Sequence, residues 1–113
     1  MKTEKNKFNV HVKGKYKDFE DFLTKNKDLI YGGVIDSFKE LLGTRKRKIN
    51  YTVNATVKLD NDDIVEWKTE FTLVKGEPDI LIEHIMPHFE EKEDYEKCSE
   101  ILNLHKELTN KQK

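Results

Sequence analysis

The sequence has few of the features that would assign it to a class of protein at once. A single cysteine, Cys98, has no partner for a disulfide within the chain and fits a reducing compartment. No apolar run approaches the roughly 18 residues that a membrane-spanning helix needs. The first residues also lead into no hydrophobic segment of a signal peptide. We therefore expect a cytoplasmic protein without a membrane partner.

Motifs for catalysis and for cofactor binding are missing too. The Gly32-Gly33 pair lacks the Lys-Ser/Thr that follows in a phosphate-binding loop, and no serine or cysteine stands in a known nucleophile motif. Asp60, Asp62 and Asp63 begin like a calcium loop, but the glycine and the terminal glutamate of that loop are absent. We predict no cofactor and no enzymatic activity. A small-ligand binder or an enzyme of unidentified chemistry is kept as a further alternative.

Charge, in contrast, is plentiful and is segregated along the chain. Charged residues make up 38% of the sequence, yet the net charge is only −1. Residues 1–58 carry a net charge of +7 and residues 59–113 one of −8, which suggests a basic and an acidic region. Aromatic residues make up 10% of the chain, so wholesale disorder is not expected. The length predicts one compact domain over residues 1–113, with frayed tails at 1–6 and 110–113.

Alternating apolar residues predict a β-hairpin in the middle of the chain. Apolar side chains occupy every second position over 49–59, and again over 65–73 with Thr69 as the exception. This is the pattern of strands with one buried face. The segment 60–63 between them supplies turn residues. Because the other face of the hairpin is polar, we expect helices on one side of the sheet and solvent on the other.

One more strand and several helices complete the predicted fold. Residues 8–12 alternate like a strand that ends at Gly14, and residues 17–42 have the spacing of two helices, or of one helix kinked at Gly32-Gly33. Two C-terminal helices are predicted over 80–85 and 91–109, the second with a buried stripe of Tyr95, Cys98, Ile101, Leu102, His105 and Leu108. The predicted class is therefore α+β, with a three-stranded, mainly antiparallel sheet and helices packed on one face.

Both arginines of the chain lie in a basic run between a predicted helix and the hairpin: Arg45, Lys46, Arg47 and Lys48. Such a run can neutralise phosphates, and binding of this kind depends on salt and little on base sequence. With the lysines of the first strand and its turn, Lys13, Lys15 and Lys17, it supports the alternative of a nucleic-acid-binding protein. The competing interpretation is a solvated loop whose cations favour the preceding helix C-terminus.

An acidic run lies near the start of the last predicted helix, with carboxylates at Glu90, Glu91, Glu93, Asp94 and Glu96. Acids in the first turn of a helix are stabilised by the helix dipole, which is the structural interpretation. The functional interpretation is a surface that binds a basic partner. We take these five residues as the candidate partner-binding residues.

The spacing of histidine and cysteine raises the question of a metal site. His84 and His88 are four residues apart, and Cys98 and His105 share a predicted helix face. Zinc favours such ligands. However, Pro87 interrupts the helix that would align the two histidines, and seven residues of helix separate the other pair by about 10 Å. We therefore predict no metal site.

These observations define no specific activity. They predict a small intracellular, non-enzymatic interaction module, of the kind that phages and mobile elements encode as accessory proteins. It would bind a partner protein, or a second copy of itself, through the acidic C-terminal helices or the exposed face of the sheet. Nucleic-acid binding through residues 44–48 and the N-terminal lysines is the alternative.

Overall fold

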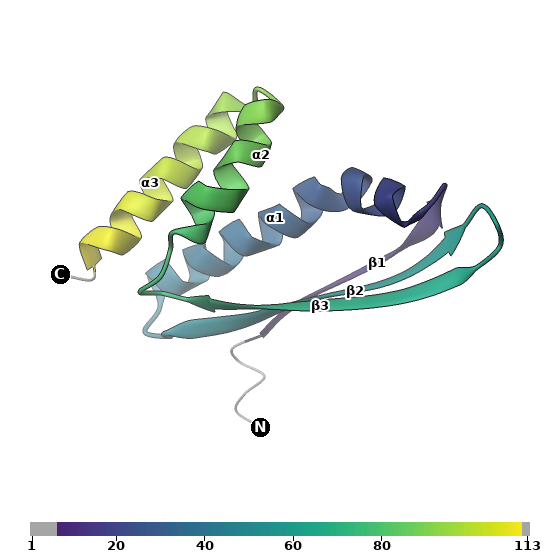
Figure 1. The fold of residues 1–113 in the computed structure, drawn as a ribbon. Coiled ribbons are helices and arrows are strands. Elements are labelled where there is room, and N and C mark those ends of the chain that lie inside the picture. The colour runs from purple at the N-terminus through teal and green to yellow at the C-terminus, as the bar shows by residue number, and fades with distance from the viewer. Residues whose placement is uncertain (1–6, 112–113) are drawn as a thin grey trace.

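A computed structural model describes residues 7–111 of the chain, and side-chain surroundings from Val12 to Asn110. The elements follow in the order β1 (Lys7–Tyr16), α1 (Phe19–Gly43), β2 (Lys48–Leu59), β3 (Ile64–Val74), the π-helical turn η2 (Leu81–Ile85), α2 (Met86–Glu91) and α3 (Tyr95–Lys111). Figure 1 shows a curved sheet with α1 along one face, and α2 and α3 on the same side of the sheet. The helices thus form a one-sided layer.

The strands lie in the order β1-β2-β3, so β2 is central and the other two strands are edges. β2 and β3 form the predicted antiparallel hairpin, in which Ala55 lies opposite Trp67. β1 pairs with β2 in parallel, with Val12 opposite Ala55, and α1 provides the long connection that parallel neighbours need. The predicted α+β class, the hairpin and the one-sided helical layer are confirmed. The sheet combines one parallel pair with one antiparallel pair.

The chain passes from β1 into α1 through a capped turn. β1 continues past Gly14, its predicted end, because Gly14 still pairs with Val57 of β2. Asp18 then caps the helix: its Oδ1 accepts a hydrogen bond from the Asp21 N–H at 2.8 Å. Of the two alternatives for residues 17–42, the pair of helices is wrong, because α1 is a single helix that includes both Gly32 and Gly33.

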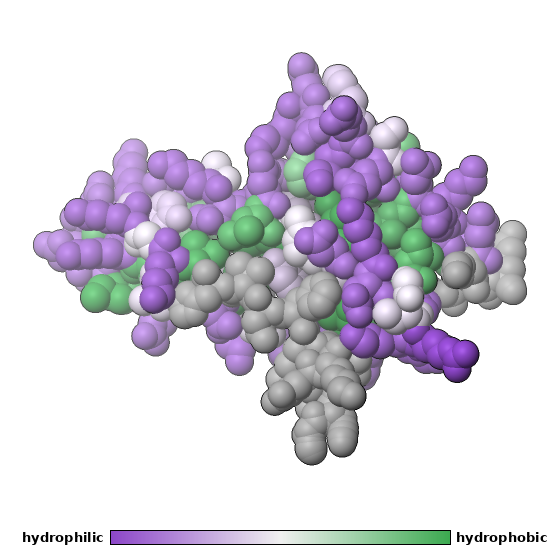
Figure 2. Space-filling model, turned by 180° about the vertical axis from the view of Figure 1, so that it is seen from behind, coloured by the Kyte–Doolittle hydropathy of each residue, from purple (hydrophilic) through white to green (hydrophobic). Residues whose placement is uncertain are grey.

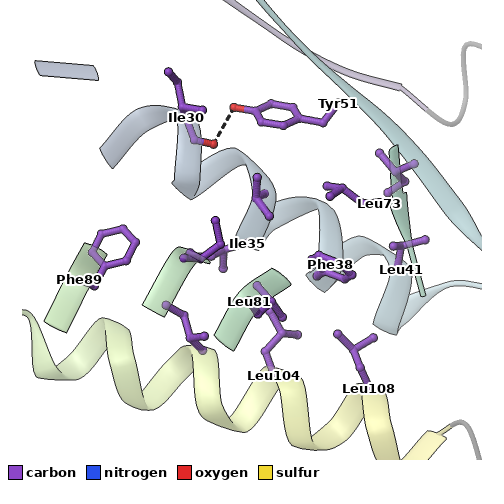
Figure 3. Packing of buried hydrophobic residues seen from close by; sticks show 14 of the residues in the cluster. Ile30, Ile35, Phe38, Leu41, Tyr51, Leu73, Leu81, Phe89, Leu104 and Leu108 are labelled. Atoms are coloured by element: carbon purple, nitrogen blue, oxygen red, sulfur yellow. Dashed lines mark hydrogen bonds between the residues drawn. The ribbon is translucent and has the colours of Figure 1, made fainter. Parts of the chain in front are cut away.

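Gly33 has a packing role where the sequence suggested a break. A Cβ built on Gly33 would lie 2.1 Å from the hydroxyl oxygen of Tyr51 on β2. Tyr51 is fully buried, and its hydroxyl donates a hydrogen bond to the carbonyl of Ile30 at 3.0 Å, as Figure 3 shows. The missing side chain at Gly33 therefore lets the tyrosine of the central strand reach the backbone of α1.

Tyr51 makes the stability of the fold sensitive to alkaline pH. Burial, with a smaller contribution from Asp36, raises the pKa of Tyr51 from 10.0 to about 12. Because the folded protein binds this proton more tightly than the unfolded chain, the contribution of Tyr51 to stability is complete below pH 10 and is lost as the pH rises toward 12. We expect Tyr51→Phe to cost about 1 kcal/mol at neutral pH, the value of one hydrogen bond.

The measurement is the free energy of unfolding of both proteins in urea at several pH values. The difference between wild type and Tyr51→Phe should close as the pH rises above 10, since phenylalanine does not ionise. A difference in the free energy of unfolding that stays constant up to pH 12 would contradict the raised pKa of Tyr51.

The main core joins the sheet to all of the helices. Figure 3 shows Phe38 of α1, Leu81 of η2 and Leu104 of α3 pointing toward one another, and all three are buried. A smaller cluster lies toward the hairpin turn, where Phe22 of α1 packs edge-on against Trp67 of β3 with ring centroids 5.7 Å apart. The C-terminal helices therefore share their hydrophobic core with α1 and the sheet.

The last helix differs from its prediction at both ends and in its buried stripe. α3 begins at Tyr95, after a turn in which Glu93 has a φ of 60°, and runs to Lys111. Tyr95 and Leu102 are 67% and 51% exposed, while Leu104 is buried with the other stripe residues Cys98, Ile101 and Leu108. Leu102 lies about 100° around the helix from Ile101, which places it outside the stripe. None of the helices within residues 7–111 is long and apolar enough to cross a membrane.

Candidate functional site

The five predicted partner-binding residues lie exposed where α2 turns into α3: Glu90, Glu91, Glu93, Asp94 and Glu96. Figure 1 places this turn at the end of the helical layer that lies farthest from the sheet. Asp94 has a structural role, because its Oδ1 accepts a hydrogen bond from the Lys97 N–H at 3.2 Å and so caps α3. That the other carboxylates bind a partner stays a prediction.

A cluster of charged groups joins this turn to α1. Asp28 of α1 lies 2.7 Å from Nε2 of His88 and 2.5 Å from Nζ of Lys92. Hydrogen bonds from Lys92 and His88 hold the pKa of the Asp28 carboxyl below its usual value. His88 also packs edge-on against Tyr31, with ring centroids 5.1 Å apart. These contacts tie α2 to α1, which is a structural role.

The histidines and the cysteine considered as metal ligands are engaged separately. His88 contacts Asp28, whereas His105 Nε2 lies 3.0 Å from Asp79 Oδ1. Cys98 is buried, and burial, aided by the nearby acids Glu90 and Asp94, raises the pKa of its thiol. In the part of the chain that the structure describes, no group of three or more His, Cys, Asp or Glu side chains could hold a metal ion.

The sequence suggested that Pro87 interrupts the helical segment, but the segment continues through it. It lies in the first turn of α2, directly after η2, so the two elements run on without a loop. A proline ring clashes with the carbonyl four residues before it in a regular helix. The turn directly before Pro87 is π-helical, with the Met86 N–H donating to the Leu81 carbonyl five residues earlier.

The basic run occupies the connection between α1 and β2. Arg45, Arg47 and Lys48 are exposed, while Nζ of Lys46 lies 3.0 Å from a carboxylate oxygen of Glu40. The backbone of the run is held to the sheet, because the Lys75 N–H donates to the Arg47 carbonyl at 2.8 Å. The run is therefore an ordered extension of the hairpin, with three of its four cations toward solvent.

The two basic segments of the nucleic-acid hypothesis lie at opposite ends of the sheet. Lys15 pairs with Lys58 near the hairpin turn, whereas Lys48 begins β2. At about 3.3 Å per strand residue, this separates the two ends by about 30 Å. The structure does not bring residues 44–48 together with Lys13, Lys15 and Lys17 in one patch. Nucleic-acid binding stays a prediction.

The face of the sheet opposite the helices is polar, as expected. Its positions on β2 and β3 include Asn50, Thr52, Asn54 and Lys58, and Glu66, Lys68, Glu70 and Thr72. Thr52 Oγ1 donates to Glu70 Oε2 at 3.3 Å, and Thr72 Oγ1 donates to Asn50 Oδ1 at 3.2 Å. Figure 2 shows that hydrophilic side chains also dominate the surface seen from behind, with small hydrophobic areas between them. A broad apolar docking face is therefore not found on either of these surfaces of the described chain.

An open groove of about 700 Å³ runs beside the end of β3, beneath η2. Its walls include Leu73 and Val74 of β3, and Ile80, Glu83 and His84 of the helical side. Its lining combines apolar side chains with polar and charged ones, a mixture that suits contact with a polypeptide. The groove is a space for binding, bordered on one side by an edge strand.

The free edge of β3 is the feature that the sequence analysis missed. The Leu59 N–H donates to the Asp63 carbonyl at 2.8 Å, so each odd-numbered residue of β3 directs its backbone N–H and C=O toward β2. The even-numbered residues direct theirs outward: Ile64, Glu66, Lys68, Glu70, Thr72 and Val74. Within the described chain only one of these outward groups is bonded, the Val74 carbonyl, which accepts from the Glu77 N–H at 2.9 Å.

Comparison with known proteins adds no assignment. No family model matches the chain, and no curated protein or solved structure is similar to it at a significant level.

Proposed function

We propose that this protein is a non-enzymatic interaction module that binds another polypeptide strand along the outer edge of β3. The observation that carries the proposal is the row of outward N–H and C=O groups from Ile64 to Thr72, which have no partner in the described chain. An unpaired strand edge of this kind is a template for pairing with another strand. Added strands bind through the main chain and gain specificity from alternate side chains.

Other surfaces of the molecule are weaker candidates for the binding site than the edge of β3. The acidic turn carries charge alone, and Asp94 and Lys92 in it have contacts within the fold. The groove beneath η2, in contrast, borders β3 at Leu73 and Val74, where it leaves space for side chains of an added strand. We place the module in the cytoplasm, which its single, buried cysteine supports.

The test uses a backbone change at the centre of the edge. Lys68→Pro removes an outward N–H and leaves the β2–β3 ladder in place, because proline is tolerated where its missing N–H faces outward from an edge strand. The control is Lys68→Thr, which removes the same side chain and keeps the N–H. Tagged full-length wild type and Lys68→Thr should recover the same bound polypeptide from the native cells, including untagged copies of this chain. Lys68→Pro should lose it.

Folding of both variants is checked by amide exchange at the odd-numbered residues of β3, which should stay protected. If folded Lys68→Pro retains the same polypeptides in the same yield as Lys68→Thr, the edge is not the binding site and the proposal is wrong.

A further inference from the structure

We propose that the strand that binds this edge is β3 of a second copy, paired antiparallel in a register centred on Thr69. The inference rests on the proposed function, since it names the partner of the same edge. A two-fold axis through Thr69 would join two three-stranded sheets into one of six strands, with the helices of both copies on the same face. A contact of this kind is isologous, so each pairing away from the axis occurs twice.

The backbone permits only certain registers. Hydrogen bonds across the contact need outward residues opposite outward residues, so even-numbered residues must face even-numbered ones. A centre on Thr69 meets this condition along all 11 residues of β3. It places Lys68 opposite Glu70 of the second copy, and Glu66 opposite its Thr72. The exposed Ile64 then faces Val74 of the second copy.

The charges select this register from its neighbours. A centre on Lys68 would place the two copies of Lys68 opposite each other, and Glu66 opposite Glu70. A centre on Glu70 would place the two copies of Glu70 together. Like charges directly opposite each other on a sheet are destabilising, whereas Lys68 and Glu70 attract when Thr69 is the centre. A centre on Trp67 also pairs unlike charges, but it leaves residues 71–74 outside the ladder.

The helix-facing side of β3 fits the same register. Trp67 and Phe71 are only partly buried within one copy, and they lie opposite each other across the proposed contact. Aromatic pairs of this kind stabilise neighbouring strands. Val65 of the second copy lies opposite Leu73, at the groove of about 700 Å³ beneath η2. Ile64, which is 67% exposed in one copy, gains an apolar neighbour in Val74.

Charge reversal at Lys68 and Glu70 tests both the contact and its register. In Lys68→Glu, and equally in Glu70→Lys, like charges face each other twice in the pair of copies. Each single variant should therefore associate about ten-fold more weakly than wild type. When the two variants are mixed, a carboxylate faces a lysine at both crossings, so a mixed dimer should form. The double variant Lys68→Glu/Glu70→Lys should likewise associate as wild type does.

Sedimentation and light scattering of the full-length proteins over a dilution series measure these outcomes. The single variants must unfold at a denaturant concentration close to that of wild type, and the double variant controls for loss of the Thr52–Glu70 hydrogen bond. Wild type that stays monomeric at every concentration would overturn self-pairing, as would single variants that associate like wild type or fail to form the mixed dimer. The proposed strand-binding function is judged separately, because capture that depends on the Lys68 N–H can succeed with a different polypeptide.

Discussion

Gly33→Ala is expected to lower the free energy of unfolding by about 1–3 kcal/mol. The added methyl group would lie 2.1 Å from the hydroxyl oxygen of Tyr51 and 2.2 Å from its Cζ, which is far inside van der Waals contact. Tyr51 has no exposed surface, and its hydroxyl is bonded to the Ile30 carbonyl. Overpacking of this kind costs about 1–3 kcal/mol, and loss of the hydrogen bond from Tyr51 to Ile30 adds about 1 kcal/mol. The higher helix propensity of alanine offsets about 0.5–1 kcal/mol of this loss.

The adjacent glycine supplies the control for this change. A Cβ built on Gly32 meets no atom within 4 Å, so Gly32→Ala adds a methyl group without a clash. Because alanine favours the helix, Gly32→Ala should raise the free energy of unfolding by about 0.5–1 kcal/mol. Urea unfolding of the two variants gives the comparison. Equal effects of the two substitutions, in either direction, would show that Gly33 acts through helix propensity and not through the contact with Tyr51.

The glycine pair also shows why the sequence predicts some features of this fold and misses others. The hairpin was predicted because alternation is a local pattern, and its two strands are separated only by turn residues. A glycine pair in a helical pattern likewise gives a local indication of a break. The need for Gly33 arises instead from Tyr51, which approaches from a different element, and no local pattern records that approach.

The prediction of strand order from the sequence is limited in the same way. The alternation of β1 predicts a buried face but does not say which neighbour the strand has or in which direction it runs. The parallel pairing of β1 with β2 follows from α1, which crosses the sheet as one continuous helix between them. In α3, two stripes that differ by a small rotation both have helical spacing, and only packing against α1 and η2 selects Leu104 over Leu102.

Segregation of charge along the sequence is reduced by the fold. The basic and acidic halves meet in the hairpin, and Lys39 of α1 forms an ion pair with Glu100 of α3. Hydrogen bonds from Lys39 and Lys97 hold the pKa of the Glu100 carboxyl below its usual value. The charges that matter for the proposed contact are closer together, on β3. Their order, Glu66, Lys68 and Glu70, is readable in the sequence, but its significance depends on β3 being an edge strand.

Leu81→Ala is expected to lower the free energy of unfolding by about 3–4 kcal/mol. Leu81 is fully buried in η2, between Phe38 of α1 and Leu104 of α3 (Figure 3). Its truncation to alanine leaves a cavity between these elements, which the surrounding structure closes only in part. The control is Leu102→Ala on α3, where the side chain is 51% exposed and the change should stay within about 0.5 kcal/mol.

Urea unfolding followed by circular dichroism and by tryptophan fluorescence measures both the size of the loss and its cooperativity. Trp67 reports on the sheet, whereas most of the ellipticity comes from the helices. Because one buried cluster includes residues of the sheet, α1, η2 and α3, the two signals should change together in Leu81→Ala, at a lower urea concentration than in wild type. If ellipticity is lost first and the fluorescence transition stays at the wild-type position, the C-terminal helices are a separate cooperative unit. The edge of β3 would then be held by the hairpin and α1 alone.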